Sequence, residues 1–466
     1  MSNNLERTLN LKDSISVVVG SMIGCGIFIV SADISRMVDN ALVLLLVWLL
    51  AGLFSLTGAI AYAEPVLNIK EDGGQYIFLK KMFNDLTAFL YGWSLLLVIQ
   101  TATIAAVCIA VGKFLGILFP LVSSENLIIN LSHLKISTQQ LFATFVCILL
   151  TFINSRGIKY GVITQNIFTI TKVLSIVGII VFGLFLGCNF DVISSNFSNA
   201  INFNGLTFNY IETVAAATVG AIFAMVTWNN ITFISAEVKE PEKNIPLALF
   251  WGVVIVMVLY LLINILYTFS IPLEQIQNAP EDIVAVVLMQ NITGAIGKII
   301  IAIIIMISAC GSANGLILAG ARVYYQMAKD NLLFNKLGVA DEKTKAPSNS
   351  LILQCFWSCV FILLCGNYSE LLDYVIYAAL IFYVLTAIGI FVYRFKNKET
   401  IKNKVNNFFG IFFIALGSFI IYSLTIHKFA NSMKTLLIIA TGIPIYIVWK
   451  KYKMQKTCVK INKKVS

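Results

Sequence analysis

Charged side chains are scarce in this chain of 466 residues, since Asp, Glu, Lys and Arg together make up only 12% of it. Hydrophobic residues make up 59%, a larger share than ordinary soluble domains have. Long apolar runs with few charges are typical of helices that cross a membrane. The composition therefore predicts an all-α, polytopic membrane protein and excludes a soluble globular domain.

Histidine and paired cysteine are also lacking. The two histidines, His133 and His427, fall in expected loops or helix ends, which argues against a histidine-based membrane hydrolase or acyltransferase. Nine cysteines are scattered through apolar runs without a pairing pattern. Cys355 and Cys359 share a helix face, but without a neighbouring histidine we expect them to pack as small hydrophobic side chains. We predict no enzyme activity, no metal and no cofactor.

Twelve apolar runs are predicted as membrane-spanning helices, for which about 20 residues suffice. They cover residues 14–37, 40–66, 84–117, 138–155, 160–188, 213–237, 245–271, 294–329, 349–367, 369–394, 406–426 and 433–450.

Lysine and arginine concentrate in alternate loops, which places those loops and both termini in the cytoplasm. The polar residues 1–13 show no cleavable signal pattern before the first span, and we expect a bacterial inner membrane. The net charge of +10 includes a basic tail, residues 451–466, that we expect to contact anionic lipid; nucleic acid is not an expected partner.

The first span contains three glycines in its middle, Gly20, Gly24 and Gly26. Each glycine weakens a helix by roughly 1 kcal/mol relative to alanine, and unwound backbone at membrane depth is tolerated only where it packs in protein or lines a watery cavity. A broken helix offers N–H groups on one side and carbonyls on the other. A zwitterion such as an α-amino acid would satisfy both ends.

The glycines of the first span could also serve helix packing or phosphate binding. Gly20 and Gly24 have the small-xxx-small spacing that lets helices pack closely, and this role stays open. A phosphate loop is discounted because no strand precedes the stretch.

The sixth span repeats the pattern of the first. Polar residues, among them Asn229 and Asn230, interrupt its apolar run, and Pro241 and Pro246 end one helix and start the next. Two interrupted helices, each first in a group of five spans, predict a five-plus-five inverted repeat with a binding site between the halves. The predicted boundaries are 14–188 and 213–394 for the repeats, with 406–450 outside them.

Lys172 lies about a dozen residues into the fifth span, roughly 18 Å deep at 1.5 Å per residue. A lysine at this depth costs about 2.5–3.5 kcal/mol, so it should face the protein interior and have partners. Ser312 and Asn314 in the eighth span offer polar groups at similar depth. Hydrogen bonding between helices and contact with a ligand both remain open for these two residues.

Four stretches together resemble the amino acid–polyamine–organocation superfamily of transporters, and the match looks closest to bacterial permeases akin to the L-type exchangers. The resemblance covers nearly the whole chain. The stretches are Gly20-Ser-Met-Ile-Gly-Cys-Gly-Ile-Phe28, Gly73-Gly-Gln-Tyr76, Glu237-Val-Lys-Glu-Pro-Glu-Lys-Asn-Ile-Pro246, and Gly311-Ser-Ala-Asn-Gly315 followed by Arg322 to Asp330.

The resemblance implies that the backbone at the two breaks binds an amino acid. The substrate carboxylate would contact the N–H groups of Gly24, Cys25 and Gly26, and the amino group would contact carbonyls of Met22, Phe223 and Val226. Ile23 and Ala224 complete this set, and the Phe223 ring would cover the substrate. Lys172 would replace the sodium ion of sodium-coupled relatives and tie the first span near Gly20 to the eighth near Ser312.

Two positions depart from the family pattern. Cys25 stands where serine is frequent, so a hydroxyl contact would weaken while a backbone contact survives. Val226 and Thr227 stand near the sixth-span break, where glycine is common. We expect these β-branched residues to narrow the pocket and limit unwinding, which favours small or medium substrates.

The predicted function is secondary active transport of neutral amino acids by alternating access. A Lys172 that stays charged implies exchange without a coupling ion. A Lys172 that releases its proton on burial implies proton symport. A cationic amino acid or polyamine antiporter is the rival, but it would need a carboxylate near the substrate, and Glu64, Glu237 and Asp373 are not obviously placed there. An amino acid sensor or channel is the alternative of another class.

The expected partners are the amino acid substrate, membrane lipid and, for symport, protons. We expect a monomer or homodimer, and no disulfide-linked heavy chain.

Overall fold

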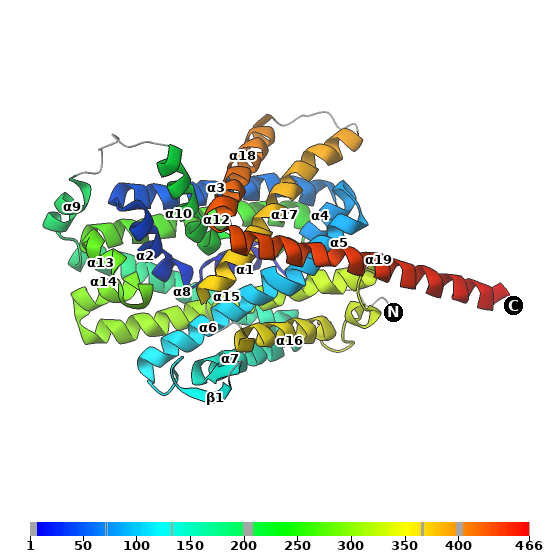
Figure 1. Cartoon of the computed structure of the whole chain (residues 1–466), viewed down its shortest axis with the longest axis horizontal. Helices are drawn as coiled ribbons and strands as arrows, with labels where there is room; N and C mark the ends of the chain where they lie inside the picture. The colour runs from blue at the N-terminus through cyan, green and yellow to red at the C-terminus, as the bar shows by residue number, and fades with distance from the viewer. Residues whose placement is uncertain are drawn as a thin grey trace.

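The computed structural model describes residues 7–69, 71, 73–131, 134–198, 208–364, 368–397 and 404–465. Parts of the predicted segments, namely residues 1–6, 365–367 and 466, lie outside the described residues. The described chain is a bundle of roughly parallel and antiparallel helices (Figure 1), which confirms the predicted all-α, polytopic class.

The helices that match the predicted spans account for most of the chain. They are α1 (Leu11–Met22) with α2 (Gly26–Val38), α3 (Ala41–Asn68), α5 (Asp85–Ser94) with η1 (Leu95–Ile99) and α6 (Gln100–Leu118), α7 (Thr138–Ser155), α8 (Ile158–Leu186), α10 (Phe208–Met225) with α11 (Asn230–Phe233) and η2 (Ser235–Glu237), α12 (Pro241–Ser270), α15 (Ala295–Lys329), α16 (Ser348–Leu364), α17 (Tyr368–Lys396), α18 (Lys404–His427) and α19 (Phe429–Val465).

Nine helices of the described chain are long and apolar enough to cross a membrane, and the bent pair α1 and α2 makes a tenth. The sixth and ninth predicted spans correspond to α10 and α16, which are apolar but shorter. Both predicted breaks are confirmed, since α1 and α2 meet at a 42° bend and α10 ends at Met225. The domain boundaries drawn from the repeat pattern stay a prediction.

Shorter elements in the connections escaped sequence analysis. They are α4 (Gln75–Met82), the hairpin of β1 (Leu127–Leu131) and β2 (Leu134–Ser137), α9 (Phe190–Phe197), α13 (Leu273–Gln277), η3 (Pro280–Asp282), α14 (Val284–Thr293) and η4 (Asn335–Gly338). The strands pair antiparallel, with Asn130 opposite Lys135. These elements are too short to show a clear hydrophobic period, which explains why the sequence pattern misses them.

Local sequence sets where several helices begin. Asn10 caps α1 by accepting a hydrogen bond from the Asp13 N–H, and the Asp13 carboxylate accepts one from the Asn10 N–H. Ser137 and Gln140 form the same reciprocal cap at the start of α7. Pro241 stands at the first position of α12, where its missing N–H costs nothing. These caps satisfy helix ends that have no intrahelical partner.

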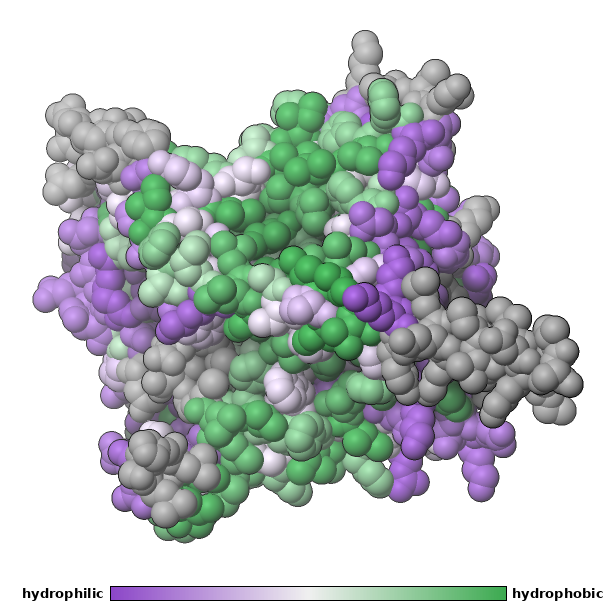
Figure 2. Space-filling view, turned by 45° about the vertical axis from the view of Figure 1, so that its right-hand side comes forward, coloured by the Kyte–Doolittle hydropathy of each residue, from purple (hydrophilic) through white to green (hydrophobic). Residues whose placement is uncertain are grey.

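The surface divides into an apolar middle and polar ends. Figure 2 shows a broad hydrophobic band with hydrophilic residues gathered toward the two sides. Large apolar side chains on α7, α8 and α15, such as Phe145, Leu174 and Ile299, are exposed on the outside of the bundle. The start of the described chain and the end of α19 lie at one end, while α9, α13 and α14 lie at the other (Figure 1). This arrangement fits a protein embedded in a bilayer.

Candidate functional site

The break in the first span lies between Met22 and Gly26. Ile23 has extended dihedrals, φ −73° and ψ 101°, so α1 stops there and α2 starts three residues later. The last carbonyls of α1 and the first N–H groups of α2 have no partners within their own helices. They therefore depend on groups from other elements or on a ligand.

Lys172, a fully buried residue of α8, binds the carbonyl end of α1. Its Nζ donates to the Gly20 carbonyl at 2.7 Å, the Ile23 carbonyl at 2.6 Å and the Ser308 carbonyl of α15 at 3.1 Å. Ser312 Oγ lies 3.4 Å from the same Nζ and donates to the Ile23 carbonyl at 2.7 Å. The positive charge offsets the partial negative charge at the C-terminus of α1. The contacts join α1, α8 and α15, while the role of Lys172 in coupling stays a prediction.

The sixth span is unwound between Met225 and Asn230. Thr227 has φ +73°, a conformation that costs a β-branched residue of order 1–3 kcal/mol. The expectation that Val226 and Thr227 limit unwinding is therefore wrong. The surrounding helices hold the strained backbone, and strain of this kind collects at functional sites.

The two breaks touch each other. A Cβ on Gly26 would lie 2.9 Å from the Cβ of Ala224, so a larger residue at position 26 would push α2 away from α10. Tyr260 of α12 lies beside both breaks, with its hydroxyl 3.1 Å from the Met22 carbonyl and 3.3 Å from the Ala224 carbonyl. The sequence gives no sign of this role for Tyr260, because nothing in the apolar run around it marks its depth or direction.

The glycines of the first break have different roles. A Cβ on Gly20 would meet the side chains of Gln165 and Thr169 at 2.1 Å, so this glycine lets α1 pack against α8. Gly24 is less crowded, since its Cβ would lie 3.2 Å from Ser312 Oγ. The packing role therefore holds for Gly20, while Gly24 and Gly26 lie at the break itself.

A small cavity lies against the sixth-span break. Helices α5, η1 and α6 form one wall, α17 forms another, and Gln75 of α4 contributes as well. It is lined by Gln75, Tyr91, Leu95, Ile99, Gln100, Thr103, Val226, Thr227, Asn229, Asn230, Phe233, Val375, Ala379 and Tyr383. None of these lining residues carries a charge at neutral pH.

Of the predicted site residues, only Val226 lines this cavity; Gly24, Cys25 and Gly26 lie outside it. The wall from α5 and α6 escaped sequence analysis. The π-helical turn η1 is a signal that only the backbone reveals, and such turns are frequent at functional sites.

Some of the buried polar atoms without partners lie in or next to the two breaks. Among the described residues, Thr227 Oγ1 and Asn230 Nδ2 in the sixth span have no hydrogen-bond partner, nor does Ser21 Oγ in the first. Asn229, in contrast, accepts from Tyr383 Oη at 2.9 Å and donates to Gln75 Oε1 at 2.8 Å. Unpaired buried polar atoms cost about 1–3 kcal/mol each, so they favour a polar ligand at this place.

The carboxylates considered for a cationic substrate have other partners. Glu237 forms a fully buried ion pair with Arg322, at 3.1 Å between Oε2 and Nε. Glu64 forms an ion pair with Arg394. The Asp373 side chain lies outside the part of the chain whose side chains are described. Neither described carboxylate lines the cavity.

At the end of the molecule that carries the termini, the residues before α1 pair with the backbone that follows the sixth span. The N–H groups of Thr8 and Leu9 donate to the Glu237 carbonyl, each at 2.9 Å, and the Lys239 N–H donates to the Leu9 carbonyl at 2.8 Å. A separate cavity of about 540 Å³ opens at this end beside Arg7. It does not include residues of either break, so we do not assign the site to it.

Comparisons with known proteins identify the family. The amino acid permease family model matches residues 9–449. The chain belongs to the amino acid permease family.

Curated relatives cover nearly the whole chain. The b(0,+)-type amino acid transporter 1 of Mus musculus is 26% identical over 455 residues, which is 97% of this chain and 90% of that protein. The large neutral amino acids transporter small subunit 2 of Homo sapiens is 26% identical over 457 residues, covering 97% and 82% of the two chains. This permease is therefore an integral membrane transporter of amino acids and not an enzyme.

Proposed function

We propose that this permease carries neutral amino acids by alternating access. Its substrate carboxylate binds the N–H groups at Gly24, Cys25 and Gly26, where α2 begins and favours negative charge. The amino group binds carbonyls at Met22, Phe223 and Val226, and Ile23 and Ala224 complete the binding set. The Ile23 carbonyl itself accepts from Lys172 and Ser312. Both termini face the cytoplasm, and the protein acts as a monomer or homodimer in contact with lipid.

The substrate side chain enters the cavity beside Val226. The observation that carries the preference for neutral substrates is the uncharged lining of this cavity. A cationic side chain buried there would lack a carboxylate partner, because Glu64 and Glu237 are engaged by arginines. The cavity measures only about 20 Å³, little more than the space of one water molecule, so the site must widen to admit a side chain, and small or medium side chains are favoured.

Lys172 acts as a fixed cation, and the permease exchanges one amino acid for another. The support is that three carbonyls lie within 3.1 Å of its Nζ, one for each ammonium hydrogen. A lysine that releases its proton would leave this carbonyl cluster with fewer donors. Proton symport is the competing coupling mode.

Uptake into proteoliposomes separates the two modes. Half of the vesicles are preloaded with unlabelled amino acids, and half are empty under an imposed proton gradient. We expect labelled neutral amino acids to enter only preloaded vesicles. Uptake into empty vesicles that follows the proton gradient and is lost in Lys172→Ala would replace exchange by symport. Lys298→Ala, at an exposed position of α15, is the matched control.

Substrate class is tested by competition in the same vesicles. We expect unlabelled small and medium neutral amino acids to compete, and lysine, arginine and polyamines not to compete. Strong competition by the cationic compounds would favour the cationic antiporter instead. Channel activity would appear as flux that needs no counter-substrate and shows no saturation.

Orientation is tested at Cys188, which is exposed beyond the end of α8. This residue lies at the opposite end of α8 from Ile158, where the α7–α8 connection is placed on the cytoplasmic side. An impermeant maleimide should label intact cells, and Cys188→Ser should lose that label. Labelling that requires opened cells would reverse the proposed orientation.

A further inference from the structure

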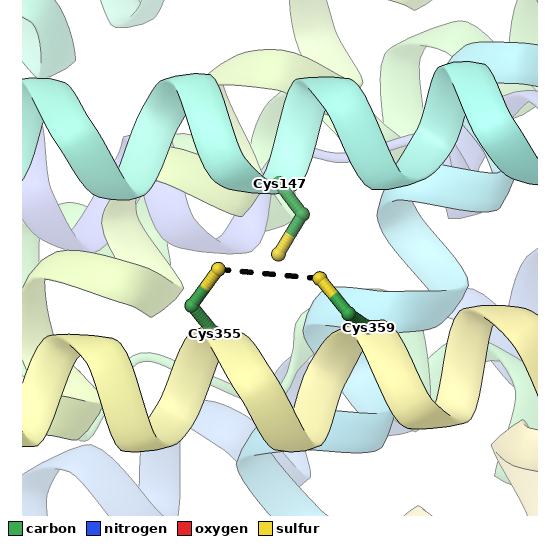
Figure 3. A group of neighbouring side chains, drawn as sticks. All are labelled: Cys147, Cys355 and Cys359. Carbon is green, nitrogen blue, oxygen red and sulfur yellow. Dashed lines mark hydrogen bonds between the residues drawn. The ribbon is translucent and has the colours of Figure 1, made fainter.

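Three cysteine thiols from two helices converge away from the substrate site. Cys147 lies in the middle of α7, while Cys355 and Cys359 lie one turn apart on α16 (Figure 3). The three Sγ atoms all lie within 4.8 Å of one another, and those of Cys355 and Cys359 are 4.0 Å apart. Cys147 is completely buried, and the other two are half-buried.

The spacing of the sulfur atoms suits a metal ion. With a Zn–S bond of about 2.3 Å, two sulfurs on one zinc ion are separated by roughly 3.8 Å in tetrahedral and 4.0 Å in trigonal geometry. The observed separations need only small rotations of the side chains to reach these values. A fourth cysteine, the buried Cys108 of α6, interacts with Cys147 from the adjacent helix.

We propose that Cys147, Cys355 and Cys359 form a binding site for one soft divalent d¹⁰ cation of the zinc and cadmium class. An all-sulfur set of ligands selects soft metals over calcium or magnesium. The expectation that Cys355 and Cys359 only pack as hydrophobic side chains took account of these two thiols alone. The third, Cys147, is 208 residues away from Cys355 in the chain, and only the fold brings it near.

Binding changes the charge of the cluster. All three thiols release their protons to water, because a thiol that coordinates a divalent metal ion binds as the thiolate. The ion offsets two of the three thiolate charges, which leaves one net negative charge that is held by coordination to the metal. No electrons are transferred, and the ion cross-links α7 to α16.

The site is separate from the substrate path. Neither helix contributes a lining residue to the cavity at the sixth-span break, although Trp357 of α16 donates to the Leu97 carbonyl of η1 at 3.3 Å. The ion would therefore stabilise the packing of α7 against α16 without contacting substrate. This inference does not depend on the proposed mode of transport.

Cadmium is the probe, with the purified full chain kept reduced in detergent. Equilibrium dialysis with metal analysis gives the stoichiometry, and thiolate-to-cadmium ultraviolet absorption reports sulfur ligation. Cys355→Ala and Cys359→Ala should each lose one bound equivalent or weaken its binding at least tenfold. Cys147→Ala should also lose or weaken this binding. If the Cys147→Ala protein does not fold, the variants at the half-buried Cys355 and Cys359 still test the proposal. Cys188→Ala, which removes an exposed thiol, should keep this equivalent.

A thermal measurement provides a second readout. Cadmium should raise the unfolding temperature of the parent protein and of Cys188→Ala, because a ligand that binds only the folded state stabilises it. It should not raise that of Cys355→Ala. The proposal is overturned if the parent chain binds no cadmium with sulfur ligation, or if the cysteine variants bind it equally well. It is also overturned if mass spectrometry shows that Cys147 forms a disulfide with Cys355 or Cys359 under these conditions.

Discussion

Replacing Gly311 by alanine tests whether the Lys172 contacts support transport. Gly311 lies on α15 directly opposite Lys172 of α8. A Cβ at this position would lie 2.9 Å from both Cε and Nζ of Lys172 and 2.7 Å from the Cβ of Phe168. The Phe168 Cβ is fixed to its backbone, so the two helices must separate or Lys172 must move. Either change lengthens the bonds from Nζ to the carbonyls of α1.

The expected loss of exchange rate follows from how many Lys172 hydrogen bonds Gly311→Ala breaks. One hydrogen bond that involves a charged group contributes about 1.5–3 kcal/mol. Losing one of the Lys172 bonds in the transporting states would slow exchange by about 10- to 100-fold, at 1.4 kcal/mol for each factor of ten. The measurement is the initial rate of exchange into preloaded proteoliposomes, normalised to the amount of folded protein in the membrane.

Gly178→Ala is the matched control on α8, because nothing lies within 4 Å of a Cβ at that position. This control should exchange at the parent rate and should gain helix stability of up to about 1 kcal/mol. The double variant Gly311→Ala with Lys172→Met shows whether Gly311→Ala slows exchange by displacing Lys172. If the alanine acts by displacing Lys172, the double variant should be no slower than Lys172→Met alone, because coupled residues are not additive. Fully additive losses, or parent-like exchange in Gly311→Ala, would refute the reasoning.

Three further substitutions test the breaks. Tyr260→Phe removes the hydroxyl beside the Met22 and Ala224 carbonyls, and the loss of about 1 kcal/mol should slow exchange several-fold; an unchanged rate would contradict a role at the breaks. Thr227→Gly relieves the positive φ and should raise the unfolding temperature, whereas a fall would show that the Thr227 side chain contributes more than the strain costs. Val226→Gly widens the cavity and should improve uptake of larger neutral amino acids relative to alanine. If uptake of large substrates does not increase, Val226 does not limit substrate size.

The spans and breaks were accessible to sequence analysis because both depend on local composition. Apolar length predicts helices such as α7, whose observed bounds, Thr138–Ser155, coincide with the predicted residues 138–155. The glycines around Gly24 and the polar residues around Asn229 mark the two breaks, since a membrane helix tolerates such interruptions only for a reason. Lys172 can also be recognised from the sequence as a functional candidate, because a charge at membrane depth needs partners.

The walls of the cavity could not be read from the sequence. Tyr91 and Tyr383 lie in apolar runs where nothing indicates which side faces the breaks, and the direction depends on packing between helices far apart in the chain. The same holds for the three-thiol cluster, since Cys147 meets Cys355 only through the contact of α7 with α16. The limit on unwinding expected from Val226 and Thr227 failed because tertiary contacts override a local preference.

Opposite ends of the short helix α1 are held by different contacts. Lys172 holds the carbonyl end of α1, while Leu9, just before its other end, is paired with the backbone that follows the sixth span. If α1 moves while the sixth span stays in place, Leu9 separates from Val238 and the Lys172 contacts with Gly20 and Ile23 can stay intact. The bonds at Leu9 join neutral backbone groups, whereas those at Lys172 are charge-assisted, so the former are weaker. In that motion α1 would pivot about its Lys172 end, and the proposed substrate groups at Gly24 would lie close to the pivot.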